Sequence, residues 1–351
     1  KRISMSVHFR KISVEGTPEE IGFQTGTLLK DEIYKNSEFY IAYILEKMSS
    51  QQLSNAVLNI KSLLEKFCPH LLVEIEHMAS AAKIKPEFLF AMNARTELLL
   101  SPNYNECTAI AFPKKGILAQ NWDWSSKLED NSVVIEITKP NGLKILQLTE
   151  AGVCGKIGMN NYGIGTTLNI LRTLDRNLKG VPIHIIMRCI LECQTFEEVI
   201  STVKKFTKGT SSNLIILNSD NSINVEYGGQ AWKLFNIQND FYVHTNHFIY
   251  IEGVSVDENA FENSLHRYNR SHEQLRENEQ SIVSMKNILS DTQGEHPILS
   301  KYVPYLEKNM GDTGTLATIV MDLKNGTFEV RKGNPNSVQF DINQFSKYQV
   351  I

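Results

Sequence analysis

The pattern of apolar residues changes abruptly at Cys107, and this change constrains the fold more than any other feature of the chain. Residues 17–98 carry apolar side chains at spacings of three and four, which predicts helices. From Cys107 onward, short apolar or alternating runs are separated by turn sequences, which predicts antiparallel strands. We therefore expect a helical N-terminal segment followed by a part that is rich in sheet.

Groups of strands alternate with pairs of helices in this second part. The expected strands are 108–112, 117–121, 133–138, 143–148, 153–159, 163–169, 214–218, 223–227, 231–235, 241–245, 315–322 and 327–331, and the expected helices are 183–193, 196–205, 258–276 and 281–289. Because a sheet buries its apolar face against another layer, this order favours an α+β fold of two antiparallel sheets packed together with helices outside them. We expect one integrated domain, since the sequence contains no low-complexity linker.

Composition argues against several kinds of partner. The chain is 42% hydrophobic and 21% charged, with a formal net charge of -3 and no dense run of basic residues, which argues against a nucleic-acid partner. No apolar run approaches the ~18 to 20 residues of a membrane helix, and residues 1–7 lack the apolar region of a signal peptide. We therefore expect a cytoplasmic protein with no membrane partner. The five cysteines are an odd number without disulfide-like density, so we expect reduced thiols.

Cys107 and Asp123 belong to one expected hairpin. The strands 108–112 and 117–121 are joined by the turn sequence Pro113-Lys114-Lys115-Gly116, and antiparallel pairing returns Asp123 towards the end where Cys107 begins. A thiol and a carboxylate brought together in this way can act as a nucleophile and an orienting acid. A cysteine at the start of a strand is more often only a small buried apolar residue. Asp123 alone has an equally plain interpretation as an acid in a turn.

Four stretches of the sequence resemble the penicillin acyltransferase (peptidase C45) family of N-terminal nucleophile hydrolases, and the resemblance extends over most of the chain. These stretches are residues 15–22 with Gly26; residues 93–97; residues 106–108 with 120–123; and residues 149–160 with Gly163 and Asn169. The resemblance implies a four-layer αββα sandwich. It further implies that residues 1–106 form a helical pro-segment, which stays bound as a smaller subunit, and that residues 107–351 form the catalytic part.

The resemblance also implies a zymogen that cleaves its own Glu106–Cys107 peptide bond. Cys107 would then begin a new chain and carry a free α-amine. An α-amine with an ordinary pKa of about 7.7 to 8.0 is a suitable base for a thiol with an ordinary pKa of about 8.5. One residue thus supplies both nucleophile and base for cleaving or transferring acyl groups at amide or thioester bonds, and the reaction needs no metal or organic cofactor.

By similarity to the family, Asp123 would hold the amine or the thiol in place, and the side-chain amide of Asn246 would help to form an oxyanion hole. A backbone N–H of residues 166–169 would supply the second donor. Trp122 and Trp124 would form an apolar wall for an aromatic or fatty acyl group, and we expect only one of them to face the site.

Thr108 and Asn169 complete the expected substrate-binding residues. The expected partner is a small acyl amide or a substrate that resembles acyl-coenzyme A. Hydrolysis is the simpler outcome and transfer to an amine the other, and the sequence leaves the oligomeric state open.

Two departures from the family pattern stand out. Glu106 is a bulky carboxylate where a small residue is expected, so cleavage would be slow or dependent on pH. The active-site arginine of the family has no clear counterpart. Arg267, Arg270 and the stretch Ser300-Lys301-Tyr302 are the candidates, so a lysine or a displaced arginine would serve.

Other interpretations stay open. His184 and Arg188, four residues apart on an apolar helix, suggest catalysis, although such groups more often satisfy buried carbonyls. His244 and His247 flank Asn246 and suggest a papain-like Cys–His pair. The whole chain is alternatively a processing-defective protein that binds a ligand without turnover. A third possibility is an amidase like penicillin V or bile-salt hydrolases, which the long segment before the nucleophile argues against.

Overall fold

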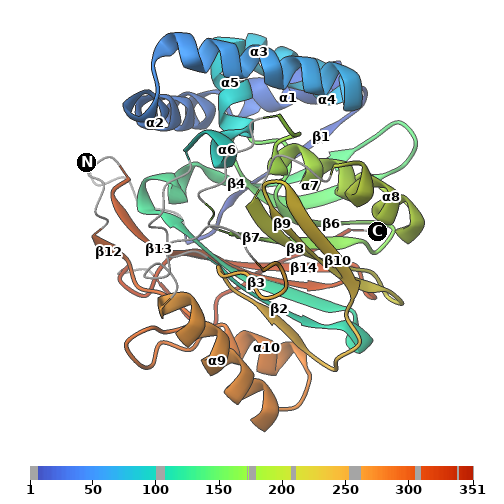
Figure 1. The fold of residues 1–351 in the computed structure, drawn as a ribbon, viewed down its shortest axis with the longest axis vertical. Coiled ribbons are helices and arrows are strands. Elements are labelled where there is room, and N and C mark those ends of the chain that lie inside the picture. Colours follow the sequence, from blue (N-terminus) through green and yellow to red (C-terminus); the bar gives the residue numbers. More distant parts are fainter. Residues whose placement is uncertain are drawn as a thin grey trace.

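The structure is a computed structural model that describes residues 7–99, 107–171, 173, 179–206, 211–252, 262–304, 310–337 and 340–350. Two β-sheets lie face to face at its centre, and helices cover both outer sides (Figure 1). The expected α+β sandwich is therefore confirmed. In the part of the chain that the structure describes, no helix is long and apolar enough to cross a membrane.

The larger sheet consists of β1 (Arg10–Glu15), β4 (Ser132–Thr138), β5 (Lys144–Glu150), β6 (Ile157–Asn160), β7 (Gly165–Ile170), β8 (Ser211–Leu217), β9 (Ser222–Gly228) and β10 (Ala231–Asn236). Its strands follow one another in that order across the sheet. β1 runs parallel to β4 from the Arg10–Val133 pair to the Glu15–Thr138 pair, and the other neighbours are antiparallel.

The smaller sheet consists of β2 (Thr108–Phe112), β3 (Ile117–Ser125), β11 (Tyr242–His244), β12 (Val303–Pro304), β13 (Asp312–Asp322), β14 (Thr327–Lys332) and β15 (Ser346–Gln349). The strand order is β11-β2-β3-β13-β14-β15, and β12 pairs with β13. Every pair in this sheet is antiparallel. β3, which contains Asp123, therefore lies in the middle of the sheet.

Six helices precede the first hairpin within residues 7–99, the described part of the N-terminal segment. They are α1 (Pro18–Leu28), α2 (Lys30–Lys47), α3 (Ser50–Phe67), α4 (Pro69–Ala82), α5 (Pro86–Asn93) and α6 (Arg95–Leu99). Thr17 caps α1 with a capping box, in which its side chain accepts from Glu20 N–H and the Glu20 side chain accepts from Thr17 N–H. α1 packs closely on α4, because a Cβ atom at Gly22 or Gly26 would lie 2.2 or 2.3 Å from a carbonyl oxygen of α4. These two glycines belong to the first stretch that resembles the family.

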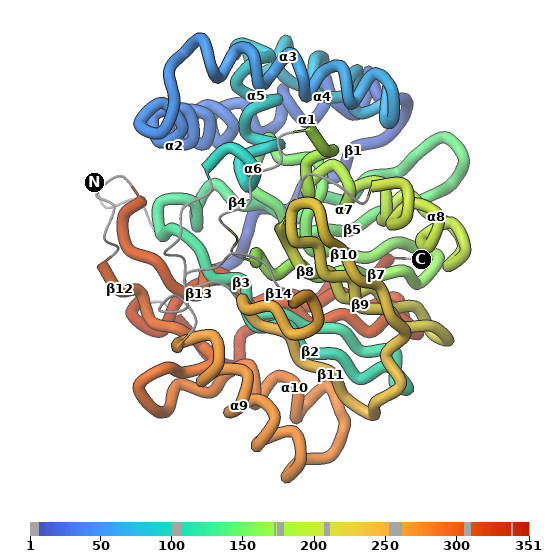
Figure 2. Tube along the Cα trace, viewed as in Figure 1, coloured from blue at the N-terminus to red at the C-terminus, as the bar shows by residue number. Residues whose placement is uncertain are grey.

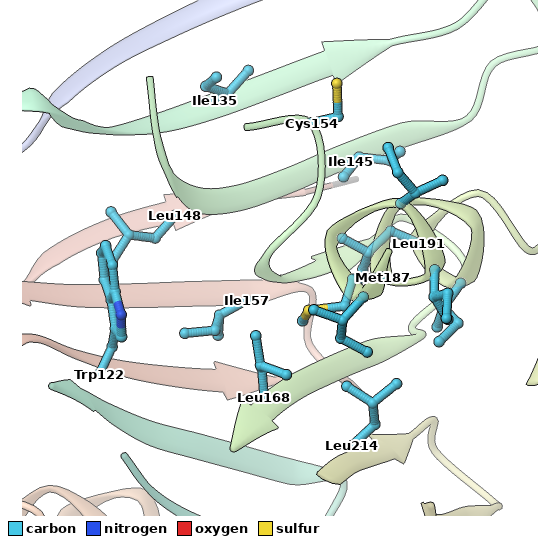
Figure 3. Packing of buried hydrophobic residues seen from close by; sticks show 14 of the residues in the cluster. Trp122, Ile135, Ile145, Leu148, Cys154, Ile157, Leu168, Met187, Leu191 and Leu214 are labelled. Atoms are coloured by element: carbon cyan, nitrogen blue, oxygen red, sulfur yellow. The ribbon is translucent and has the colours of Figure 1, made fainter. Parts of the chain in front are cut away.

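The remaining helices cover the two sheets from outside. α7 (Ile183–Leu191) and α8 (Phe196–Lys205) lie with the N-terminal helices on the side of the larger sheet, and α9 (Glu262–Glu277) and α10 (Ile282–Ile288) lie on the opposite side (Figure 1). A small apolar cluster joins α9 and α10 to the smaller sheet and includes Phe112, Leu275 and Met285. The main core fills the space between the sheets and below the N-terminal helices, where Figure 3 shows Trp122 and Leu168 among its side chains.

Several boundaries differ from those expected. The tube in Figure 2 shows that the N-terminal segment is not wholly helical, since β1 enters the larger sheet. The parallel β1–β4 pair also makes this sheet mixed rather than antiparallel. The expected strand 153–159 begins only at Ile157, and the expected helix 258–276 is described from Glu262 onward because residues 253–261 lie outside the described residues. The short strands β12 and β15 were not expected.

Candidate active site

The β2–β3 hairpin forms as its turn sequence predicted. Gly116 closes the turn at a φ of 68°, and the strands pair from Phe112 with Ile117 to Thr108 with Asn121. Asp123 therefore lies two residues beyond the last pair, at the same end of the hairpin as Cys107. Glu106 lies outside the described residues.

Cys107 is buried, with 4% of its surface exposed, and its φ of 38° lies in the left-handed region. A residue with a Cβ atom rarely adopts this conformation, which costs on the order of 1 to 3 kcal/mol and persists where the surroundings enforce it. The Cys107 carbonyl oxygen accepts hydrogen bonds from Arg267 Nη1 at 2.9 Å and from Asn169 Nδ2 at 3.1 Å. These two donors fix the peptide group that follows the strained residue.

Arg267 connects most of the predicted site residues. Its guanidinium donates to Thr108 Oγ1 and Asn246 Oδ1, both at 2.9 Å, in addition to the Cys107 carbonyl. Its Nε donates to Asn263 Oδ1 at 2.6 Å. Of the candidates that the sequence offered for an active-site arginine, Arg267 contacts Cys107, whereas Arg270 pairs with Asp291.

The burial of Arg267 has a signal in the sequence. Ser264, Arg267, Ser271 and Leu275 are the buried residues of α9, and they follow one another at spacings of three and four. One face of α9 therefore turns inward, and an arginine on that face needs several acceptors because its charge is desolvated.

Asn246 is buried, with its side chain held at both ends. Its Oδ1 accepts from Arg267, and its Nδ2 donates to the carbonyl oxygen of Ile170 at 3.0 Å. The backbone N–H of Leu168, within the segment expected to supply a second oxyanion donor, instead donates to Gln120 Oε1 at 2.9 Å. Asn169 contributes its side chain, which bridges the carbonyls of Cys107 and His244.

Asp123 lies on the face of β3 that is opposite to its tryptophans. It is 2% exposed and accepts a hydrogen bond of 2.6 Å from Thr315 Oγ1. Burial raises the pKa of Asp123, and the charge of Arg267 and hydrogen bonds from Thr315 and Ser300 only partly oppose that effect. The carboxyl group lines a cavity of about 220 Å³.

Trp122 and Trp124 line one narrow cavity together with Cys107, Leu168 and Ile170. The expectation that only one tryptophan faces the site is therefore wrong. Residues two apart on a strand point to the same side, so both side chains lie on one face of β3 and line this cavity. The cavity thus has two indole walls beside the thiol.

A buried network of charged residues, which the sequence did not predict, lies at this cavity. Glu150 pairs with Arg95 at 3.0 Å and with Lys156 at 2.6 Å, and Tyr40 donates a further hydrogen bond to Glu150. Lys156 Nζ also lies 3.5 Å from the centre of the Trp122 ring. Arg95 and Lys156 line the cavity beside Cys107.

The network perturbs the ionisation of its members. Burial lowers the pKa of Lys156 to about 7, with Arg95 lowering it further and Glu150 opposing both. Arg95 and Lys156 hold the pKa of Glu150 well below its ordinary value in spite of burial. Glu150 and Lys156 lie in the fourth stretch that resembles the family. No periodicity in the sequence predicts an ion pair between Glu150, at the end of β5, and Lys156, which directly precedes β6.

The other histidines and Arg188 have partners of their own. His184 contacts the Gly155 carbonyl at 3.0 Å, and Arg188 forms a bidentate pair with Glu74 at 3.0 and 2.8 Å. His244 Nε2 lies 2.8 Å from Glu226, and His247 Nδ1 lies 2.8 Å from Ser264 Oγ. These contacts favour the structural interpretation of His184 and Arg188 that the sequence left open.

Comparisons with known proteins identify the family and several relatives of this chain. The model of the family described as acyl-coenzyme A:6-aminopenicillanic acid acyl-transferase matches residues 112–337. The acyl-coenzyme A:6-aminopenicillanic-acid-acyltransferase 40 kDa form of Emericella nidulans is 27% identical over 339 residues, which cover 93% of each chain.

Solved structures give more distant matches. The penicillin V acylase from Agrobacterium tumefaciens has a TM-score of 0.44 and 16% identity, covering 65% of this chain and 83% of that one. The N-acylethanolamine-hydrolyzing acid amidase ortholog of Caenorhabditis elegans has a TM-score of 0.44 and 16% identity, covering 70% of this chain and 100% of that one. A variant of the conjugated bile acid hydrolase from Clostridium perfringens has a TM-score of 0.45 and 13% identity, covering 70% and 97%.

The chain is an enzyme of acyl transfer or amide hydrolysis. It belongs to the acyl-coenzyme A:6-aminopenicillanic acid acyl-transferase family, whose model matches more than half of its length.

Proposed function

We propose that this enzyme is a self-processing cysteine hydrolase or acyltransferase, in which cleavage of the Glu106–Cys107 bond makes Cys107 an N-terminal nucleophile. The observation that carries the proposal is the state of Cys107, which is buried with a φ of 38° while Arg267 and Asn169 hold its carbonyl oxygen. Cleavage of the Glu106–Cys107 bond releases the backbone of Cys107 on one side, so relief of its strain favours cleavage.

In the mature enzyme, the α-amine of Cys107 takes the thiol proton, and the thiolate attacks the acyl carbonyl of the substrate. An oxyanion develops on the carbonyl oxygen. A carboxamide nitrogen has two N–H donors, and Asn246 uses one of them on the Ile170 carbonyl. The second donor can bind the oxyanion, because Arg267 occupies Oδ1 and fixes which end of the amide is the nitrogen.

The cavity walled by Trp122 and Trp124 favours an aromatic or fatty acyl group. The curated relative is named for an acyl-coenzyme A donor and 6-aminopenicillanic acid as acceptor. For this chain we infer a small acyl amide or a substrate resembling acyl-coenzyme A, and water or an amine as acceptor. Thr108 and Asn169 support the site by binding Arg267 and the Cys107 carbonyl.

The N-terminal segment supports the idea that residues 1–106 stay bound after the cut. β1 completes one edge of the larger sheet, and Arg95 and Tyr40 bind Glu150 of β5. These are buried contacts between the two expected pieces. We therefore infer a mature protein of two associated chains.

The intact mass of the denatured protein tests the proposal. The wild-type chain should give two fragments that end at Glu106 and begin at Cys107, and Cys107→Ala should give one uncut chain. Cys154→Ala is the matched control, because it removes another buried thiol and should cleave normally. A single intact chain in all three samples would overturn self-processing.

An uncut chain would favour the alternative of a ligand-binding protein. Iodoacetamide labelling separates the two functions. A nucleophile at Cys107 should be labelled much faster than Cys154 or Cys193, since burial raises the pKa of both of these thiols. Equal and slow labelling of all three cysteines would argue against an activated nucleophile.

A further inference from the structure

The uncut chain needs a base that the mature enzyme does not. Before cleavage the α-nitrogen of Cys107 is part of a peptide bond, where its lone pair is delocalised and it cannot accept a proton. A thiol with an ordinary pKa of about 8.5 is mostly protonated at neutral pH. The first cleavage therefore requires another group near Cys107 to take the thiol proton.

Lys156 lies beside Cys107 in the same cavity. Its side chain is 1% exposed and lines the same narrow cavity as Cys107, Trp122 and Leu168. Glu150 Oε2 holds Nζ at 2.6 Å, and the Trp122 ring lies below Nζ at 3.5 Å. Thr108 pairs with Asn121 across the hairpin, so the next residues outward, Cys107 and Trp122, lie opposite each other. The amine is thus fixed on the thiol side of β3.

The ionisation of Lys156 suits this role. Burial lowers its pKa to about 7, so a large share of the amine is neutral at physiological pH. The charged and titratable groups that face it are Glu150 from β5, Arg95 from α6, His184 from α7 and the Cys107 thiol. Burial lowers the pKa of His184 far below its ordinary value, so His184 stays neutral in the range in which Lys156 titrates.

We propose that Lys156 is the general base that starts self-cleavage in the uncut chain, a role that rests on the proposed cut between Glu106 and Cys107. The neutral Nζ takes the proton of the Cys107 thiol, and the thiolate attacks the carbonyl carbon of Glu106. The Lys156 ammonium then gives its proton to the Cys107 nitrogen as the C–N bond breaks.

These steps leave a thioester between Glu106 and Cys107 and return Lys156 to its neutral form. Water then adds to the thioester, giving the Glu106 carboxylic acid and restoring the thiol. The sum is the hydrolysis of one amide bond, and the new α-amine takes over as base for later substrates.

The experiment follows self-cleavage of the full chain over time after cell-free synthesis. Loss of a general base costs about 10²- to 10⁴-fold, so Lys156→Met should slow cleavage by at least about 10². Lys156→Arg should be equally slow, because arginine keeps the charge beside Glu150 but does not give up its proton. Lys144→Met, which replaces a half-buried lysine at the other end of β5 from Glu150, is the control and should cleave at the wild-type rate.

Two further measurements distinguish a role of Lys156 as a base from a purely structural role of its charge. The wild-type rate should rise with pH through about 7 and then level, whereas the residual rate of Lys156→Met should keep rising towards the ordinary range of a thiol. In Lys156→Ala, added methylamine should restore cleavage in proportion to its neutral form. Thermal unfolding of each variant shows whether the fold is retained.

Two outcomes would overturn the role of Lys156. One is cleavage of Lys156→Arg at the wild-type rate, which would show that only the charge matters. The other is a folded Lys156→Met that cleaves normally. If the wild-type chain itself does not cleave, self-processing fails instead. Labelling of Cys107 by iodoacetamide in the uncut wild type and in Lys156→Met then still tests whether Lys156 activates the Cys107 thiol. Equal labelling rates in that case would overturn the proposal as well.

Discussion

Arg267 Nη2 donates a 2.9 Å hydrogen bond to Asn246 Oδ1, so the guanidinium determines which way the carboxamide faces. The other terminal nitrogen of Arg267 binds the Cys107 carbonyl and Thr108. One side chain from α9 therefore aligns the expected oxyanion donor with the backbone of the expected nucleophile.

Replacing Arg267 with lysine should reduce both self-cleavage and turnover. A single ammonium cannot reproduce the fork that binds Asn246, Thr108 and the Cys107 carbonyl at once. We expect a fall of roughly 10²-fold in kcat/KM, since misplacing the oxyanion donor costs a comparable amount. Arg270→Lys is the matched control on the same helix, where Arg270 pairs with Asp291. Equal losses in both variants would show that the effect comes from α9 as a whole.

Asp123→Asn should make the protein more stable and less active. Burial raises the pKa of Asp123, so the folded state binds a proton more readily than the unfolded state. Stability from this group is therefore greatest below its unfolded pKa and falls as pH rises through the raised folded value. At pH 7 the carboxylate is destabilising, and the neutral amide removes this cost. Chemical unfolding at pH 7 together with substrate turnover checks both halves, and a variant less stable than the wild type would contradict the sign.

Glu150→Gln should strongly destabilise the fold. The substitution leaves Arg95 and Lys156 buried without their shared anion, and breaking a buried ion pair costs about 3 to 5 kcal/mol. Urea unfolding at neutral pH measures this loss. Glu136→Gln removes an ion pair with Lys11 that is partly exposed and should cost less than about 1 kcal/mol.

The ion pairs of Glu150 with Arg95 and Lys156 also predict how its contribution to stability changes in acid. Its pKa is lowered in the folded state, so its contribution to stability is present above its unfolded pKa. That contribution is lost as the pH falls towards the folded value. The difference in stability between wild type and Glu150→Gln should therefore shrink in acid, and a constant difference from pH 7 to pH 3 would argue against a charged Glu150.

Trp124→Ala should change the choice of acyl group. Removing one indole wall enlarges the cavity beside Cys107, so the preference for aromatic or fatty acyl groups over acetyl should fall by about ten-fold or more. Competition between two acyl amides measures the ratio of kcat/KM values. Trp232→Ala, on the partly exposed strand β10, is the control. An unchanged ratio in Trp124→Ala would place the acyl group elsewhere.

Much of the fold could be predicted because the strands and helices carry local signals. The hairpin from Thr108 to Asn121 follows from a turn with Gly116, and α8 follows from the cap at Thr195. β1 escaped prediction because its partner, β4, is more than a hundred residues away, and pairing over such a distance leaves no local pattern. β15 is an edge strand of 4 residues, which is too short to carry a clear alternating pattern.

The site was predictable where the family pattern names residues, and less so where burial decides their chemistry. Cys107, Thr108, Asn169 and Asn246 do lie together around Arg267. The importance of Lys156 could not be inferred, because a lysine between two short strands is ordinarily exposed. Only the packing of Trp122 and Glu150 around it shows that its charge is desolvated.

The parallel pairing of β1 with β4 gives the proposed cut a kinetic consequence. In the uncut chain, the two strands belong to one polypeptide, and folding brings them together at a rate that does not depend on protein concentration. Once the chain is cut, the same strand pair joins two separate molecules, and refolding after denaturation becomes a bimolecular encounter. Diluting the denatured mature protein should therefore slow its recovery, whereas the uncut Cys107→Ala chain should recover at the same rate at every dilution.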